Sequence, residues 1–450
     1  MDIKNKRSII LLGHAQSGKT SLSESLLFRC KAITRKGSIA GGSTVSDYSC
    51  DEIERKFSIN ASFMFSDYQD TRIQIVDTPG YIDFCGEVIS GIHAVDNALI
   101  VIDAHSGVQV GTEKAWNMVE ELKLPRIIFV NKSDIEGIDQ NKIIEDIRSS
   151  LSKKAVSLEK ADELMELVAE SDDELLAKYL DTGTLSLDEL NQGLRKAVIS
   201  AKVFPVIFGS SLKDNGIDGL LNAVKDYCAS PLERPAPELI EGKLAISPDA
   251  PFSAFVFKSI IDPYVGQLSL VRIFSGKLLA GSNFYNITQK ASERIGQVYF
   301  LQGKEQHFTE SADCGDIVAI PKLKVTRTSD SLSEQANPVV FKPQVWPEPM
   351  MSASIKPHSR QDEEKISQAV AKLIAEEPTL KVFRDQETNE EIISGLGDLQ
   401  LNVMVNRLKK KFNVEVDLGT PKVPYKETIT KSVRMQGKYK KQSGGRGQYG

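Results

Sequence analysis

The chain has 450 residues, of which 41% are hydrophobic and 26% are charged, and its formal net charge is −5. This composition excludes a disordered chain, and the length predicts two to four domains. No apolar run approaches the ~18–20 residues that span a membrane, and the acidic balance argues against a general nucleic-acid coat protein while allowing local basic patches.

Residues 1–235 alternate short apolar runs with amphipathic stretches, which is the pattern of an α/β domain with a largely parallel central sheet. The expected buried strands are Ile9–Leu12, Arg72–Val76, Ala98–Ile102, Arg126–Val130 and Val206–Phe208. The acidic segment at about 150–201 is expected to be a mostly helical insertion late in this domain.

A glycine-rich loop lies between the first predicted strand and a helix expected to start near Lys19. It matches the pattern GxxxxGKS/T with Gly13, His14, Ala15, Gln16, Ser17, Gly18, Lys19 and Thr20. In this context successive backbone N–H groups wrap a phosphate, and the helix N-terminus adds favourable potential. We expect Lys19 to act as a catalytic charge on the β- and γ-phosphates and the Thr20 hydroxyl to ligate Mg²⁺.

A second motif, DTPG, ends the predicted strand Arg72–Val76. It contains Asp77, Thr78, Pro79 and Gly80 and is followed by Tyr81. A carboxylate at this position holds Mg²⁺ through water, and a backbone N–H beside it senses the γ-phosphate. We therefore predict Asp77 as a metal-side residue and Gly80 as a catalytic one.

The third and fourth motifs concern the base of the nucleotide. They are Asn131, Lys132, Ser133 and Asp134, after one predicted strand, and Gly209, Ser210 and Ser211, after another. The Asp134 carboxylate can accept both N–H donors of guanine's Watson–Crick edge, whereas adenine presents an acceptor there. A mismatch of that kind discriminates by ~10⁴ or more, so the sequence predicts GTP rather than ATP, with the backbone of residues 209–211 closing over the base.

In the rest of the chain, the pattern of expected secondary structure changes twice. Prolines 231, 235 and 237 mark a linker, and residues 245–342 have the short strands and glycine turns of an antiparallel β-barrel. A second proline cluster follows at 338–349, and residues 346–424 combine strands with two amphipathic helices, which predicts a ferredoxin-like α+β domain. Residues 425–450 are expected to open a fourth domain that is cut short, leaving a fragment that binds nucleotide without driving tRNA and mRNA movement.

Taken together, these segments resemble the translational GTPases, and elongation factor G in particular. GHAQSGKT is similar to the family's GHxDxGKT, DTPGYIDF to DTPGHVDF, and NKSD to NKMD. DPYVGQLSLVRIFSGKL resembles the second domain of the family, GLGDLQLNV with PKVPYKETI the third, and KKQSGGRGQYG the opening of the fourth. The resemblance implies a monomeric cytoplasmic GTPase that uses GTP/GDP and Mg²⁺ and has the ribosome, but no membrane, as its partner. Scattered cysteines without a CxxC pair agree with a reducing cytoplasm and argue against a zinc site.

Four departures resemble the divergent elongation factor G-like paralogues of bacteria. Tyr81 replaces the histidine that places the attacking water, and Gln16 replaces the aspartate of the phosphate loop. The segment Glu54–Ile59 stands where the family has ERGITI, so Ser58 corresponds to the Mg²⁺-ligating threonine. The helical insertion, finally, lacks the strands that are usual in the family.

Two hypotheses remain open for Tyr81. In the first, its neutral phenol still hydrogen-bonds the attacking water and supports slow or ribosome-triggered hydrolysis. In the second, Tyr81 packs near the switch segment Glu54–Ile59, and hydrolysis is weak or depends on the charges of Mg²⁺ and Lys19. The resemblance likewise leaves two roles open: an elongation or translocation factor, or a GTP-dependent ribosome-binding regulator, recycling or protection factor with weak hydrolysis.

Two basic clusters are candidates for RNA contacts. Residues of the second predicted helix in the third domain are more typical of a solvated face than of an RNA contact: Arg407, Lys409, Lys410 and Lys411. Basic residues near the end of the chain are mixed with tyrosines and glycines and favour RNA more strongly: Lys438, Lys440, Lys441 and Arg446.

Overall fold

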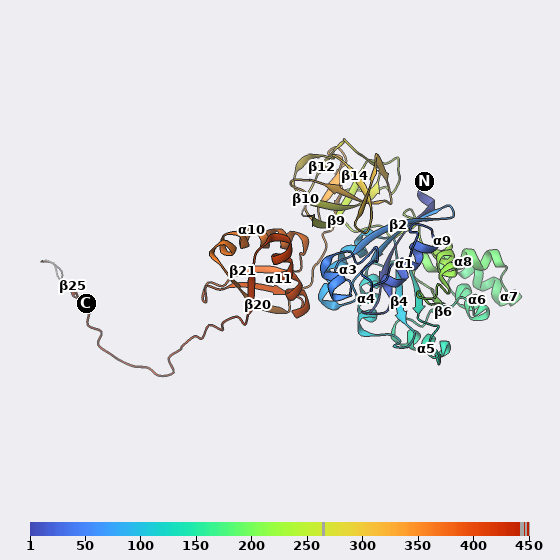
Figure 1. Ribbon diagram of the computed structural model, residues 1–450. Coiled ribbons are helices and arrows are strands. Elements are labelled where there is room, and N and C mark those ends of the chain that lie inside the picture. The colour runs from blue at the N-terminus through green and yellow to red at the C-terminus, as the bar shows by residue number, and fades with distance from the viewer. Residues whose placement is uncertain (263–265, 442–444, 446–447, 450) are drawn as a thin grey trace.

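The computed structural model describes residues 1–262, 266–441, 445 and 448–449. Three folded bodies follow one another along the chain, an α/β domain, a β domain and an α+β domain (Figure 1). The predicted fold class is confirmed in all three. Within the described residues, no helix is long and apolar enough to cross a membrane.

A seven-stranded sheet forms the centre of the first domain, in the order β2-β3-β1-β4-β5-β7-β6. Only the β2–β3 pair is antiparallel, as the largely parallel sheet predicted from the sequence requires. The strands are β1 (Lys6–Leu12), β2 (Ser62–Tyr68), β3 (Thr71–Asp77), β4 (Asn97–Asp103), β5 (Arg126–Asn131), β6 (Ala155–Ser157) and β7 (Phe204–Phe208). Strands β2 and β6 were not predicted, and β6 has only three residues, too few to show a readable alternation.

Alternate residues of the central strands supply two separate cores. Ile10 and Ile100 point to one face, whereas Ile9 and Leu99 point to the other, as the two-residue period of a strand dictates. Helices α1 (Lys19–Arg29) and α9 (Ile217–Tyr227) pack on the second face. Helices α3 (Cys85–Ala94), α4 (Val110–Glu121) and α5 (Gln140–Ser150) pack on the first, whose core continues into the β domain.

The late insertion consists mainly of helices, as expected. Helices α6 (Ala161–Glu170), α7 (Asp173–Thr182) and α8 (Leu187–Ile199) enclose a small core of their own. They project from the end of the first domain that lies farthest from the C-terminal segment (Figure 1).

The second domain is an antiparallel β-barrel with the strand order β13-β12-β18-β9-β10-β17-β14-β15. Its strands are β9 (Ser253–Asp262), β10 (Gly266–Ser275), β12 (Asn283–Asn286), β13 (Ala291–Arg294), β14 (Val298–Gln302), β15 (Glu305–Thr309), β17 (Ile317–Pro321) and β18 (Ser331–Ser333). Two short ladders accompany it, β11 (Lys277–Leu279) with β16 (Ser311–Asp313) and β8 (Leu239–Glu241) with β19 (Val340–Phe341). The second ladder joins the two proline-rich linkers to each other.

The third domain has the βαββαβ order of a ferredoxin-like fold, as predicted. Its elements are β20 (Met351–Pro357), α10 (Arg360–Glu376), β21 (Lys381–Arg384), β22 (Glu391–Gly395), α11 (Asp398–Phe412) and β23 (Val416–Gly419). The sheet order is β21-β22-β20-β23. The apolar faces predicted for the two helices supply its core, with Leu373 and Leu401 fully buried.

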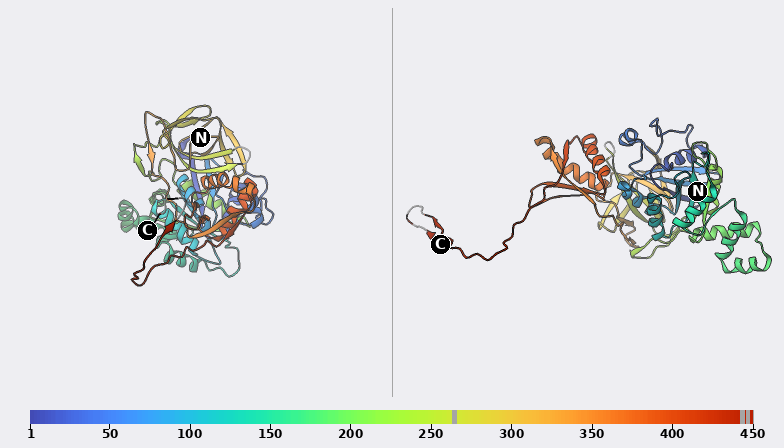
Figure 2. Two further views of the ribbon diagram at one scale, coloured as in Figure 1. Left: turned by 90° about the vertical axis from the view of Figure 1, so that its left-hand side faces the viewer. Right: turned by 90° about the horizontal axis from the view of Figure 1, so that it is seen from below.

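The remainder of the chain leaves the three domains as a single extended segment (Figure 2). Residues 420–439 contain no helix or strand and are almost entirely exposed. Strands β24 (Lys440–Lys441) and β25 (Gln448–Tyr449) then pair with each other. Arg446, one of the predicted RNA-facing residues, lies outside the described residues.

Candidate functional site

The glycine-rich loop connects β1 to α1 at the carboxyl end of the parallel strands. Its backbone needs glycine at both ends, since a Cβ on Gly13 would come within 2.2 Å of the Val101 carbonyl oxygen and φ is +92° at Gly18. Lys19 is 5% exposed, and its Nζ donates to the carbonyl oxygens of Gly13 and His14, both at 2.9 Å. Burial lowers the pKa of Lys19 to about 8, so an anion placed beside it would restore lost solvation.

The four predicted motifs meet around this loop. Asn131 accepts the backbone N–H of Ser211 at 2.9 Å and donates its own side-chain N–H to the Ser17 carbonyl, also at 2.9 Å. Lys132 extends over the loop, where its Nζ donates to the Gln16 carbonyl at 3.0 Å. Two hydrogen bonds thus fasten the NKSD segment to the phosphate loop, and a third joins Ser211 to NKSD.

Asp134, by contrast, is exposed, and within the described part of the chain its carboxylate has no hydrogen-bond or ion-pair partner. Its neighbour Ser133 is held by the Gly209 carbonyl, which accepts both the backbone N–H and the hydroxyl at 3.0 Å. The backbone next to Asp134 is therefore anchored, while the carboxylate oxygens stay available to a ligand.

Hydroxyls and carboxylates gather behind the loop. The Thr20 and Ser58 hydroxyl oxygens lie 3.0 Å apart, although 38 residues separate them in sequence. One Asp77 oxygen accepts the Ser46 hydroxyl at 2.6 Å, and the other is buried without a partner. The three residues predicted for the metal therefore come from three segments to one place.

Asp47 belongs to this cluster and was missed by the sequence reasoning. It is 4% exposed, and neither of its carboxylate oxygens has a hydrogen-bond partner. Burial, with the nearby charge of Asp77, raises the pKa of Asp47 to about 8. Oxygen ligands of this type suit Mg²⁺. A bound cation would offset the free-energy cost of burying carboxylates that have no partner. No spacing rule marks Asp47, because it lies in an irregular segment before α2 (Cys50–Arg55).

Tyr81 faces the same space from the DTPG side. Its ring packs against Phe57, with 4.9 Å between the ring centroids. Both residues line a cavity of about 240 Å³ together with Lys19, Thr20, Asp47, Ser58 and Gly80. A Cβ on Gly80 would come within 2.6 Å of the Lys19 Nζ, so the Gly80 backbone lies directly against the loop.

The third domain contacts both segments that bound this cavity. One Asp83 oxygen accepts the backbone N–H groups of Leu399 and Gln400, at 3.1 and 3.4 Å, in the first turn of α11. Arg407 is 3% exposed and donates to Asn60 at 2.5 Å, close after Ser58. The sequence-based prediction that Arg407 belongs to a solvated face is therefore wrong, because this side of α11 packs against the GTP-binding domain.

The lysines of the same helix end differ in their surroundings. Lys410 forms ion pairs with Asp51 and Glu54 at 2.9 and 2.8 Å, and Lys411 pairs with Glu376 at 2.8 Å. Lys409 is 63% exposed and pairs with Glu415. All three lysines therefore pair with neighbouring acids within the protein, and Lys409 is the most exposed of them.

Comparisons with known proteins agree with this architecture. Residues 4–230 match the family described as elongation factor Tu GTP binding domain, residues 251–335 elongation factor G domain 2, and residues 346–420 elongation factor G domain III. A crystal structure of a protein from Thermus thermophilus is similar at 32% sequence identity and a TM-score of 0.88. The match covers 99% of this chain and 72% of that one. The chain therefore belongs to the translational GTPases of the elongation factor G type.

Proposed function

We propose that this translational GTPase binds GTP together with Mg²⁺ in the cavity between the phosphate loop, Ser58 and Tyr81, and that it acts on the ribosome. The observation that carries the proposal is the convergence of Thr20, Ser58 and Asp77 behind a loop whose lysine is buried. A buried ammonium next to unpaired carboxylates fits a ligand that brings both negative phosphates and a divalent cation.

Each residue then has a distinct role. Lys19 and the loop N–H groups hold the phosphates, and the Gly80 N–H contacts the γ-phosphate. Thr20, Ser58 and Asp77 would hold Mg²⁺, which when bound neutralises charge on the phosphate oxygens. We add Asp47 to this set, because its buried carboxylate has no other partner. Asp134 accepts the guanine N–H donors, and residues 209–211 cover the base.

Loss of the γ-phosphate would release Gly80 and Ser58. These residues belong to the two segments that would rearrange, DTPG with Tyr81 and Glu54–Ile59. Because Asp83 and Asn60 contact α11, a rearrangement of either segment would change the contacts that hold the third domain against the GTP-binding domain. We propose that this coupling serves elongation, translocation or a related ribosomal step in the cytoplasm.

The second candidate role, a ribosome-binding regulator or a recycling or protection factor with weak hydrolysis, is favoured by the Tyr81–Phe57 packing. A ring held in an aromatic contact carries only a phenol, which hydrogen-bonds water but is a poorer base than a histidine side chain. This observation supports slow GTP hydrolysis. The GTP-bound protein would then be the active state, and hydrolysis would only end it.

GTP hydrolysis measured with and without ribosomes tests the proposal. We expect the ribosome to raise turnover, and an unchanged rate would contradict the coupling. Replacing Tyr81 by His then separates the two roles. A gain of at least about tenfold would indicate a site adapted for slow switching, whereas an unchanged rate would mean that position 81 takes no part in catalysis.

A further inference from the structure

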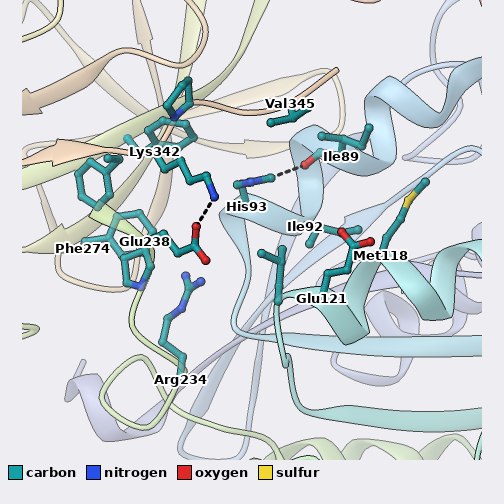
Figure 3. Close-up of a pocket in the computed structure, with 15 residues that line it drawn as sticks. Ile89, Ile92, His93, Met118, Glu121, Arg234, Glu238, Phe274, Lys342 and Val345 are labelled. Carbon is teal, nitrogen blue, oxygen red and sulfur yellow. Dashed lines mark hydrogen bonds and ion pairs between the residues drawn. The ribbon is translucent and has the colours of Figure 1, made fainter. Parts of the chain in front are cut away.

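A cavity of about 380 Å³ lies between the GTP-binding domain, the barrel and the linkers that join them. Helices α3 and α4 form one wall with Ile92 and Met118, and Phe274 of the barrel lies opposite (Figure 3). Phe255 of the barrel and Phe341 of the linker also line the cavity. Its volume lies in the ~300–1,000 Å³ range of small-molecule sites, and its walls have the mostly apolar, aromatic character of such sites.

A buried arginine marks one end of this cavity. The Arg234 side chain is 7% exposed and stacks on Phe274, with 5.0 Å from its central carbon to the ring centroid. Its Nη1 has no hydrogen-bond partner. The nearest carboxylate, Asp96, lies 3.5 Å away and is already engaged by Arg272 through two hydrogen bonds of 2.7 Å. Burial lowers the pKa of Arg234 to about 10, which reflects the same shortage of compensating charge.

The other charged groups fix the polarity of the site. Lys342 and Glu238 form an ion pair at its rim and neutralise each other, and Arg234 points toward this pair (Figure 3). Behind the wall, Asp96 is shared between Arg234 and Arg272, so one carboxylate faces two guanidinium groups at this end. Glu121 lies across the cavity on α4 and is exposed. An anionic group would therefore settle at the arginine end, and its apolar body would lie along the phenylalanines.

We propose that this cavity binds a small organic acid, with its carboxylate on Arg234 and a ring-sized apolar body between α3 and the barrel. The site is separate from the nucleotide motifs and stands on its own observations. It nevertheless bears on them, because Ile89, Ile92 and His93 of its wall belong to α3, the helix that begins directly after Tyr81–Phe84. An occupant would fix this helix against the barrel.

Calorimetric titration of the purified protein with naphthoate and with naphthamide tests the proposal. The two probes share one ring system and differ in charge. We expect naphthoate to bind with a Kd below about 1 mM and about tenfold more tightly than naphthamide, because a charge-assisted hydrogen bond is stronger than a neutral one. Binding should also raise the thermal unfolding temperature. Failure of naphthoate to bind, or equal affinity for both probes, would overturn the proposal.

Two variants and a control locate the site. Arg234→Met should abolish the preference for the acid, and Asp96 keeps its pairing with Arg272 in this variant. Arg126→Met removes another buried guanidinium, one that stacks on Trp116 at 4.4 Å away from this cavity, and should keep the preference. Ile89→Trp narrows the apolar wall and should weaken both probes. If Arg234→Met keeps the preference, or Ile89→Trp leaves both affinities unchanged, the binding is elsewhere and the proposal fails.

Discussion

Glu87 of the GTP-binding domain and Lys258 of the barrel form a buried ion pair, with 2.5 Å between Oε1 and Nζ. Their side chains are only 4% and 5% exposed. The second Glu87 oxygen accepts the backbone N–H of Ala61 at 2.5 Å, three residues after Ser58. A single carboxylate therefore joins the helix after DTPG, the segment that carries Ser58, and the second domain.

Replacing Lys258 by Met should destabilise the protein strongly. The change leaves Glu87 buried without its counter-ion, and breaking a buried pair from one side typically costs about 3–5 kcal/mol of unfolding free energy. Denaturant unfolding measures this loss. The double variant with Glu87→Gln should recover part of it, because the uncompensated charge of Glu87 is then gone, and a double variant less stable than Lys258→Met alone would contradict this account.

Glu377, which lies near Glu87 and Lys258, makes the stability of the protein depend on pH. Burial, with the neighbouring charge of Glu87, raises the pKa of Glu377 to about 6, from an ordinary value of 4.5. Between these two values the unfolded chain loses the proton while the folded protein keeps it, so this group's contribution to stability is full below pH 4.5 and falls as the pH rises through 6. The fall should reach about 2 kcal/mol.

Urea unfolding at a series of pH values measures this contribution, with Glu377→Gln as the comparison. The amide cannot ionise, so the decline attributable to residue 377 should disappear while the remaining pH dependence stays. Because the Thr379 hydroxyl donates to Glu377 at 2.6 Å, the Gln variant keeps an acceptor for that bond. Equal slopes in the two proteins between pH 4.5 and 6 would rule out Glu377 as the source.

Replacing Asp47 by Asn should have opposite effects in two states of the protein. Without ligand, the variant should be more stable by about 1–3 kcal/mol, since it removes a buried carboxylate that has no partner. In the presence of GTP and Mg²⁺ it should bind nucleotide more weakly, because a neutral amide is a poorer ligand for Mg²⁺. Thermal unfolding and nucleotide titration at several Mg²⁺ concentrations measure the two effects, and a variant that loses stability without ligand would contradict the assignment.

The sequence predicts the local parts of this molecule well and its long-range contacts poorly. The phosphate loop, DTPG and NKSD each follow a strand of recognisable pattern, so their meeting at one edge of the sheet follows from the parallel topology. The approach of Ser58 to Thr20 was expected only through the resemblance to a family. Arg407 was misjudged because helical periodicity identifies one apolar face but not a second face covered by another domain. The Glu87–Lys258 pair spans 171 residues, and no local pattern encodes it.

Asp134 allows the most selective test of the nucleotide site. An Asn at this position keeps one acceptor but presents N–H donors in place of the second oxygen. Guanine offers two donors there and would lose a bond, whereas xanthine offers one donor and one carbonyl and would gain one. We expect Asp134→Asn to weaken GTP and to favour xanthosine triphosphate, with the ratio of the two affinities changing by at least about a hundredfold. Because the native carboxylate is exposed and has no partner in the described part of the chain, folding stability should not change.

Competitive nucleotide binding measures the ratio of the two affinities. Asp139→Asn, at the N-cap of α5 a few residues away, is the control that should leave this ratio unaltered. An unchanged preference for GTP in Asp134→Asn would mean that another group recognises the base.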